Sequence, residues 1–322
     1  MTPLPGRRTL LLAPLAAPAA APGPARAQAW PARPLRMLVG YPPGSPPDLI
    51  SRLFGPGMAD RLGQPVLVEN RPGANTALAT EALLRAPPDG HTLMTMPQFV
   101  PALPAVQRVS GFDVADLLPL AGTAQAPLVL VVPPRLGVAD LPGFLALART
   151  RGEALSFAHA GHAGVPNLAM ALLAEATGIR PMGVAFRNTV QPLLSGDVDC
   201  AFGFLHDAVP QIRAGKLVGL AVTTPARSPL LPEIPCFAEL GLPAVEIAAW
   251  FAVTVHRAVP PPLQARLIAA VEAVRPDPAV QDRLTAAGFA PFALDGAALQ
   301  EFARRERDRH LALFARLGVT PE

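Results

Sequence analysis

Polar side chains that could hold a small anion follow several of the predicted strands. Ser45 and Asp48 come after the first predicted strand. Thr95 lies near the end of the third predicted strand, and Gln98 comes just after it. At such places the first turn of a helix presents unpaired N–H groups and a partial positive charge, which hold an anion without Lys or Arg. Asp48 has a second interpretation, as a residue that caps the following helix. These residue types suit the binding of a small acid.

A second polar group lies in the middle of the chain. His159 and His162 are three residues apart in a Gly-rich segment, and Arg187 follows a later strand. The imidazoles could contact an anion or a metal, and the guanidinium could pair with a carboxylate. No acidic residue or Cys is adjacent to the histidines, so solvent-facing loop histidines and a surface arginine are the alternatives. We predict no metal site and no cofactor.

Motifs of common hydrolases and nucleotide-binding enzymes are missing from the sequence. The chain has neither Gly-x-Ser-x-Gly nor His-Glu-x-x-His, which would mark a serine hydrolase or a zinc protease. Phosphate-loop and dinucleotide-binding patterns are also missing. A secreted hydrolase that uses Ser45 or His162 is a minor alternative, and no catalytic residue is predicted.

The composition excludes a disordered chain and a nucleic-acid-binding protein. Of the 322 residues, 51% are hydrophobic and only 16% are charged, which is too little charge for a disordered chain. Three of the 27 Lys and Arg residues lie in the first 29 positions, and the other 24 match the 24 Asp and Glu residues. A neutral body and an aromatic content of 5% leave little to bind nucleic acid.

The first 29 residues are predicted to be an export signal. Arg7 and Arg8 precede an apolar Leu/Ala-rich stretch, and Ala27-Gln28-Ala29 offers a cleavage site before Trp30. The arginine pair leaves a Sec or a twin-Arg route open, and a disordered Ala/Pro-rich extension is the alternative. No later stretch reaches about 18 consecutive apolar residues. We therefore expect a soluble, periplasmic protein.

The two cysteines, Cys200 and Cys236, have two interpretations. In an oxidising compartment they could form a disulfide. Cys200 also sits in an apolar strand pattern, where a small buried side chain is the alternative.

The hydrophobic pattern alternates strands with amphipathic helices, which predicts an α/β architecture. The first part of the chain reads as one β–α–β–α–β unit, and a second unit begins near Leu128. The strand at 249–255 is expected to return the chain to the first unit, and the later helices complete it. The predicted strands are 35–40, 66–68, 92–96, 128–132, 155–158, 184–186, 198–204, 217–223 and 249–255, and the predicted helices are 47–62, 76–85, 141–150, 168–176, 263–274, 279–287 and 297–317.

Segments spread over nearly the whole chain resemble the Bug-type solute receptors, the periplasmic substrate-binding proteins of tripartite tricarboxylate transporters. The residues that carry the resemblance are Tyr41-Pro42-Pro43-Gly44-Ser45-Pro46-Pro47-Asp48, Leu62-Gly63-Gln64-Pro65-Val66, Val68-Glu69-Asn70-Arg71-Pro72-Gly73-Ala74, Pro88-Asp89-Gly90-His91-Thr92-Leu93, Ala214-Gly215-Lys216-Leu217, Leu220-Ala221-Val222-Thr223, Ala226-Arg227-Ser228-Pro229, Leu231-Pro232-Glu233-Ile234-Pro235 and Trp250-Phe251.

The resemblance implies a two-domain periplasmic-binding-protein fold of the type II-like, Venus-flytrap kind, in which each domain is a mixed sheet flanked by helices. The expected domains are 30–125 with 250–322, and 126–249. The ligand, a small carboxylate, would bind in the cleft between the two domains. The receptor would be a monomer and would deliver the ligand to membrane transporter subunits. The ligand-binding residues expected on this basis are Tyr41, Gly44, Ser45, Asp48, Thr95, Gln98, His159, Gly161, His162, Asn167, Arg187 and Gly203.

The ligand loops depart from the family pattern while the scaffold keeps it. Ser45, Pro46 and Pro47 stand where the family has Gly, a variable residue and Thr, and the two prolines remove two backbone donors. In the second domain only Gly161 of a Ser/Gly-rich loop is kept, and Gly203 replaces a common aspartate. A receptor of the same fold for a neutral or aromatic amide, or a ligand-dependent partner of a sensor, is therefore an alternative to carboxylate transport.

Overall fold

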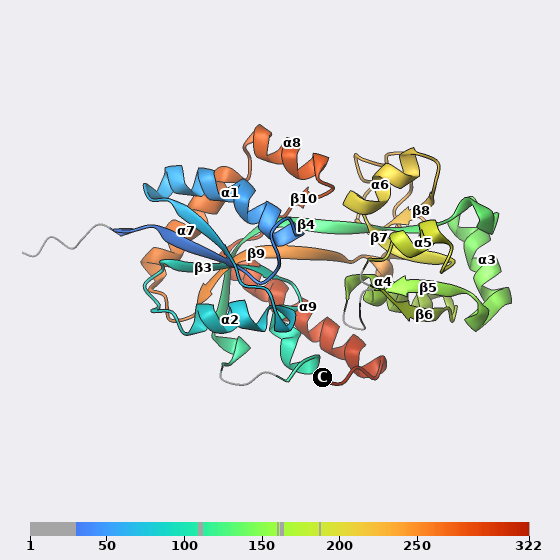
Figure 1. Cartoon of the computed structure of the whole chain (residues 1–322), viewed down its shortest axis with the longest axis horizontal. Coiled ribbons are helices and arrows are strands. Elements are labelled where there is room, and N and C mark those ends of the chain that lie inside the picture. The colour runs from blue at the N-terminus through green and yellow to red at the C-terminus, as the bar shows by residue number, and fades with distance from the viewer. Residues whose placement is uncertain (1–29, 109–111, 160, 162–163, 187, 322) are drawn as a thin grey trace, which may run out of the picture.

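The computed structural model describes residues 30–108, 112–159, 161, 164–186 and 188–321. In this part of the chain the strands form one mixed sheet in the order β2-β1-β3-β9-β4-β7-β5-β6, and β8 and β10 also pair with β4. Figure 1 shows two groups of elements joined by β4 and β9. The strands are β1 (Leu35–Val39), β2 (Val66–Asn70), β3 (Thr92–Pro97), β4 (Leu117–Val132), β5 (Ser156–His159), β6 (Met182–Ala185), β7 (Cys200–Phe204), β8 (Val218–Val222), β9 (Ala248–His256) and β10 (Ala290–Pro291).

The helices flank both groups of strands. We call β1–β3, β9, β10, α1, α2 and α7–α9 the first half, and β5–β8 with α3–α6 the second half (Figure 1). None of the described helices is long and apolar enough to cross a membrane. The helices are α1 (Pro46–Leu62), α2 (Ala77–Leu84), α3 (Leu141–Arg151), α4 (Val165–Thr177), α5 (Gln191–Ser195), α6 (Leu205–Arg213), α7 (Pro261–Val274), α8 (Pro278–Ala286) and α9 (Gly296–Arg316).

Each half contains three parallel strands. The unit predicted for the first half is confirmed, whereas the second unit does not begin near Leu128 as predicted, because residues 128–132 pair antiparallel with β7 and β8. In the first half β1 pairs in parallel with β2 and β3, and in the second half β5 pairs in parallel with β6 and β7. Parallel neighbours need long crossovers, which α1 and α2 provide in the first half and α4 and α5 in the second. The carboxyl ends of each parallel set therefore lie at one edge of the sheet.

Strand β4 continues through both halves, and the sequence analysis missed the part of it before Leu128. Its residues 117–127 pair with β9, and residues 128–132 pair with β7 and β8. Pro119 and Gly122 resemble strand breakers, but the pairing with β9 shifts register at both places. Such irregularities let a strand accommodate Pro and Gly. The sequence analysis also missed α6, which contains Pro210.

The two cysteines do not pair. Both thiols are free and buried. The Cys200 side chain is fully buried in β7, and burial raises its pKa far above the ordinary thiol value. The second interpretation of Cys200, as a small buried side chain, is the one that the structure supports.

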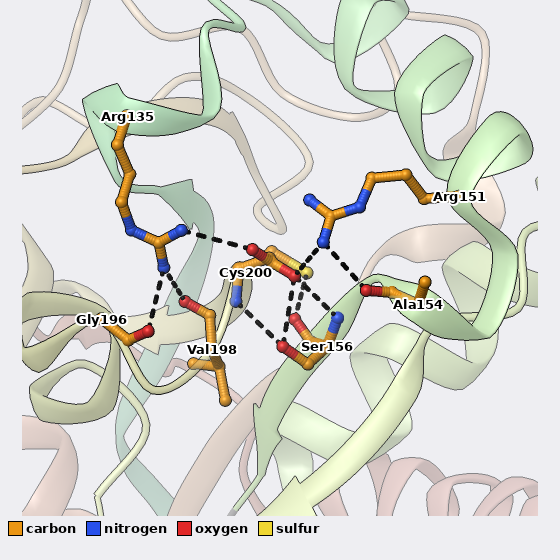
Figure 2. Close-up of polar contacts among 8 residues, drawn as sticks. Arg135, Arg151, Ala154, Ser156, Gly196, Val198 and Cys200 are labelled. Carbon is orange, nitrogen blue, oxygen red and sulfur yellow. Dashed lines mark hydrogen bonds and ion pairs between the residues drawn. The ribbon is translucent and has the colours of Figure 1, made fainter.

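The carboxylate of Asp199 ties the second half together just before β7. It accepts hydrogen bonds from the Ser156 backbone N–H at 3.1 Å and from Arg151 at 3.0 Å, and Arg135 lies 3.4 Å away (Figure 2). Burial alone would raise the pKa of Asp199, but the Ser156 N–H and the two guanidinium groups hold it below its usual value. One carboxylate thus connects β5 with the end of α3 and the segment after β4.

Replacing Asp199 with Ala should lower the free energy of unfolding by about 2 kcal/mol, because the partly buried Ser156 N–H and two arginines lose their shared acceptor. Urea unfolding followed by circular dichroism measures this value. The matched control is Asp197→Ala, which removes an exposed carboxylate two residues earlier that accepts from Ser195. Equal effects of the two substitutions would contradict the structural role of Asp199.

His310 on α9 is a buried imidazole whose two nitrogens have no hydrogen-bond partner among the described residues. Its side chain is 1% exposed, and its ring stacks on Phe314. Burial, with the nearby charge of Arg309, lowers the pKa of His310 to about 4. The imidazole is therefore neutral at pH 7, and Glu306 at 3.9 Å does not form an ion pair with it.

The burial of His310 predicts that the protein loses stability in mild acid. The unfolded chain takes up a proton on this histidine near pH 6.5, whereas the folded chain takes it up only near pH 4. Stability is therefore complete above pH 6.5 and falls as the pH drops, by about 2 kcal/mol at pH 5. Urea unfolding between pH 7 and 5 should show this loss, and His310→Phe should reduce it. An unchanged pH dependence in that variant would contradict the assignment.

Candidate functional site

The carboxyl ends of β1, β2 and β3 bring three loops of the first half together. Val39 at the end of β1 is paired with Asn70 at the end of β2, and the Arg71 N–H donates to the Val39 carbonyl. The loops that follow are 40–45, 71–76 and the segment from Gln98. In open α/β sheets, ligands bind outside the carboxyl ends of the strands.

Asp48 holds the first of these loops in place. Its carboxylate is 2% exposed and accepts hydrogen bonds from the Gly44 N–H at 2.9 Å, the Asn70 amide at 2.8 Å and the Arg52 guanidinium at 3.0 Å. Burial acts to raise the pKa of Asp48, but these hydrogen bonds outweigh it and hold the pKa below its usual value. Asn70 also donates to the Tyr41 carbonyl at 3.0 Å. The alternative of Asp48 as a plain N-cap is wrong, because Ser45 occupies that position.

Ser45 is the N-cap residue of α1, yet its hydroxyl makes no capping bond. The oxygen is buried and has no hydrogen-bond partner among the described residues. Pro46 and Pro47 occupy the first two positions of the helix, which confirms that two backbone donors are missing there. Because an unsatisfied buried hydroxyl is costly, the Ser45 hydroxyl is a candidate donor to a ligand at this helix end.

Thr76 is the corresponding residue before α2, and sequence reasoning missed it as a site residue. Its side chain is 1% exposed, and its hydroxyl also has no hydrogen-bond partner among the described residues. The backbone is left-handed at Ala74, Asn75 and Thr76, with φ of 46°, 46° and 72°. Such a run of non-Gly residues stores strain, which is common at functional sites. The sequence signal was Asn75-Thr76-Ala77 itself, which stands where the solute receptors that the sequence resembles often have Gly-Gly-Asn.

The loops after β1 and β2 touch directly. A Cβ atom on Gly40 would lie 2.5 Å from the Thr76 Cβ, so only glycine fits at the end of β1. This close approach places the start of α2 against the loop that leads to Ser45. The two unpartnered hydroxyls thus belong to two helix N-termini at the same edge of the sheet.

The remaining predicted residues of the first half lie in the loop before α1 or at the end of β3. The Thr95 hydroxyl lies 2.6 Å from the Ser51 hydroxyl, so it is already used inside the protein. Gln98 is 5% exposed, and its backbone N–H donates to the Trp250 carbonyl at 3.0 Å. Burial raises the pKa of the Tyr41 phenol to about 12, so it is a neutral hydroxyl at pH 7. Gly44 has a φ of 82°, which favours glycine.

In the second half, the structure corrects the expected position of His159. It is the last residue of β5 rather than part of a loop, it is 4% exposed, and its ring centroid lies 5.7 Å from that of Phe157. Asn167 is 8% exposed in the first turn of α4. Gly161 has a φ of 88°. His162 and Arg187 lie outside the described residues.

Gly203 has a packing reason to be glycine. It lies within β7 opposite Val129, and a Cβ atom there would lie 2.8 Å from Val190 Cγ2 and 3.3 Å from the Ala208 Cβ. A larger side chain would push α5 and α6 away from the strand. Gly203, which stands where the family commonly has an aspartate, therefore fits the close packing of β7 against α5 and α6.

Two cavities of the described structure border these loops or the helices next to them, the first through Arg71 and Pro72 and the second through Leu49 and Ile50. One, of about 650 Å³, is lined by four arginines, which already pair with Asp89, Glu69 and Glu81. The other, of about 260 Å³, lies between α1 and α8. Among the described residues, no group of three or more His, Cys, Asp or Glu side chains is placed to hold a metal ion.

Comparisons with known proteins agree with the resemblance of the sequence. A family model described as the tripartite tricarboxylate transporter family receptor matches residues 50–319. BugT of Bordetella pertussis is 30% identical over 274 residues, which cover 83% of this chain and 84% of BugT.

Solved structures give the same result. MatC (Rpa3494) from Rhodopseudomonas palustris, with bound malate, has a TM-score of 0.72 and 29% identity over 88% of this chain and 99% of MatC. Rpa4515 from R. palustris, with adipate, has a TM-score of 0.78 and 26% identity over 91% of this chain and all of that chain. The fold is the α/β fold of periplasmic binding proteins. With a family model that spans most of its length, the chain belongs to the tripartite tricarboxylate transporter receptor family.

Proposed function

We propose that this protein is an extracytoplasmic receptor that captures a small organic acid and delivers it to a tripartite tricarboxylate-type membrane transporter. The observation that carries the proposal is the pair of buried, unpartnered hydroxyls of Ser45 and Thr76 at two helix N-termini. A carboxylate placed between them would accept both O–H groups and would lie at the positive ends of two helix dipoles.

The chemistry of the relatives supports a carboxylate as the ligand. MatC was solved with malate and Rpa4515 with adipate, and both compounds are dicarboxylates. In this chain the second carboxylate would meet the loops that follow β5 and β6, where Asn167 lies and where the sequence places His162 and Arg187. The two halves would act as the two domains of the receptor, with the ligand between them.

The export signal predicted for residues 1–29 supports a periplasmic location and lies outside the described residues. We propose that the mature receptor acts as a monomer and that its partners are the transporter's membrane subunits. Catalysis forms no part of the proposal.

A thermal-shift screen of the mature protein from Trp30 onward tests the ligand class. The panel contains mono-, di- and tricarboxylates, amides and aromatic compounds. A ligand at 100 times its dissociation constant stabilises the folded state by about 2.7 kcal/mol, which is a rise in Tm of about 5 °C. A shift with a carboxylate supports the proposal.

A neutral ligand is the second candidate, because Pro46 and Pro47 remove two N–H donors from the start of α1. A shift with amides or aromatic compounds alone would favour this candidate. This result would contradict a carboxylate ligand but would remain consistent with a role as a solute receptor.

A further inference from the structure

Away from β4 and β9, the two halves also meet where the end of α8 faces the start of α6 (Figure 1). The ring centroids of His206 on α6 and Phe289 after α8 lie 5.8 Å apart with an interplanar angle of 39°. The same imidazole stacks on Phe204 of its own half at 5.6 Å and 16°. His206 therefore lies between one aromatic ring from each half.

The end of α8 aims Phe289 at the other half. Gly288 is left-handed with a φ of 75°, its N–H donates to the Thr285 carbonyl, and the Phe289 N–H donates to the Leu284 carbonyl, both at 2.9 Å. This pair of hydrogen bonds is the Schellman ending of a helix. It fixes the direction in which the chain leaves α8, so the ring of Phe289 has a defined position.

The contact is closely packed at the backbone. A Cβ atom on Gly288 would lie 2.4 Å from the His206 backbone nitrogen and 2.7 Å from its Cα. The loop after α8 thus lies directly against the first turn of α6. Any separation of the halves on this side must break both the backbone contact and the ring stack.

The other contacts between the halves described here are weaker. Arg316 on α9 reaches the second half through an ion pair of 3.2 Å with Glu175 on α4, and Arg309 on α9 donates a hydrogen bond of 2.9 Å to the Glu246 carbonyl just before β9. More than half of each side chain of the Arg316–Glu175 pair is exposed. Exposed ion pairs contribute little in water, whereas aromatic pairs add to the area that they bury.

The same contact reaches both sets of ligand loops. Phe289 lines the cavity of about 260 Å³ together with Leu49 and Ile50, which lie in the first turns of α1, and α1 begins at the Ser45 cap. His206 lies in the first turn of α6, directly after β7, whose carboxyl end is at the edge shared with β5 and β6. The contact therefore lies next to the elements that carry both sides of the proposed site.

We propose that His206 and Phe289 are positioning residues that latch the two halves together and so set the affinity for ligand, an inference that rests on the proposed function. Without the latch the halves sample more arrangements, and binding must remove that freedom at a cost in affinity. Because the proposed latch depends on the stacking of rings, another aromatic residue in place of His206 should preserve it.

The test combines isothermal titration with malate and adipate and small-angle X-ray scattering of the unliganded protein. We expect Phe289→Ala and His206→Ala to raise the dissociation constant about tenfold and to enlarge the radius of gyration. His206→Phe should stay within about twofold of wild type in affinity. The matched control is Phe302→Ala, which removes a ring that packs on Trp250 and Phe292 within the first half. It should lower Tm while leaving the radius of gyration and the affinity unchanged.

An unchanged or smaller dissociation constant in Phe289→Ala would overturn the latch, as would the same radius of gyration in Phe289→Ala and wild type. If wild type binds neither compound, the choice of ligand fails, while the scattering of the unliganded variants still decides whether the halves are latched.

Discussion

A protein carrying Ser45→Ala and Thr76→Val should bind its carboxylate about 100-fold more weakly than wild type and unfold at an unchanged urea concentration. Each hydroxyl would donate one hydrogen bond to a charged oxygen, and such bonds contribute about 1.5 to 3 kcal/mol. Two of them account for about 3 kcal/mol, which is about 100-fold in affinity. Stability should not suffer, because neither hydroxyl has a hydrogen-bond partner among the described residues of the unliganded protein.

The substitutions keep the shape of the site. Val has the branched shape of Thr and so keeps the left-handed strain at position 76 unchanged. The matched control is Thr80→Val one turn later, whose hydroxyl donates to the Thr76 carbonyl at 3.1 Å. It should leave affinity within about twofold of wild type. Wild-type affinity in the double variant would show that the ligand does not use these two hydroxyls.

Replacing Asp48 with Ala should remove ligand binding and lower the free energy of unfolding by about 3 kcal/mol. The loss follows from the number of donors that share this carboxylate, namely the Gly44 N–H, the Asn70 amide and the Arg52 guanidinium. Without it the loop that carries Ser45 loses its anchor to α1 and β2. Urea unfolding and isothermal titration measure the two effects separately.

The comparison variant for Asp48 is Asp60→Ala, which removes an exposed carboxylate from the same helix. We expect a change in unfolding free energy within about 0.5 kcal/mol and unchanged binding. Because its hydrogen bonds hold the pKa of Asp48 low in the folded state, its contribution is complete at neutral pH and is lost only below about pH 4. Wild-type ligand affinity in Asp48→Ala would show that this hydrogen-bond network does not support the ligand site.

Much of the fold could be predicted from the sequence because its local patterns agree with its tertiary structure. The β–α–β–α–β unit from Leu35 to Pro97 has apolar strands bounded by Pro and Gly turns, and the helix that ends before Gly63 was placed to within one residue. The strand before Leu128 was missed because Pro119 and Gly122 are tolerated only through its irregular pairing with β9. That pairing is a long-range property that no local pattern carries.

The site could be predicted only in part. Asp48 stood out by its position in a motif, but its partner Asn70 lies at the end of β2, and the two meet only in the folded chain. Thr76 was missed because its left-handed backbone and its burial against Gly40 are tertiary features. His159 was placed in a loop because the following glycines hid the end of β5.

A crystal structure of the mature protein with the carboxylate that gives the largest thermal shift tests the central claim most directly. We expect one carboxylate group of the ligand to lie within about 3 Å of both the Ser45 Oγ and the Thr76 Oγ1, with its other end facing the second half. A ligand bound elsewhere, with both hydroxyls still lacking a partner, would contradict the account.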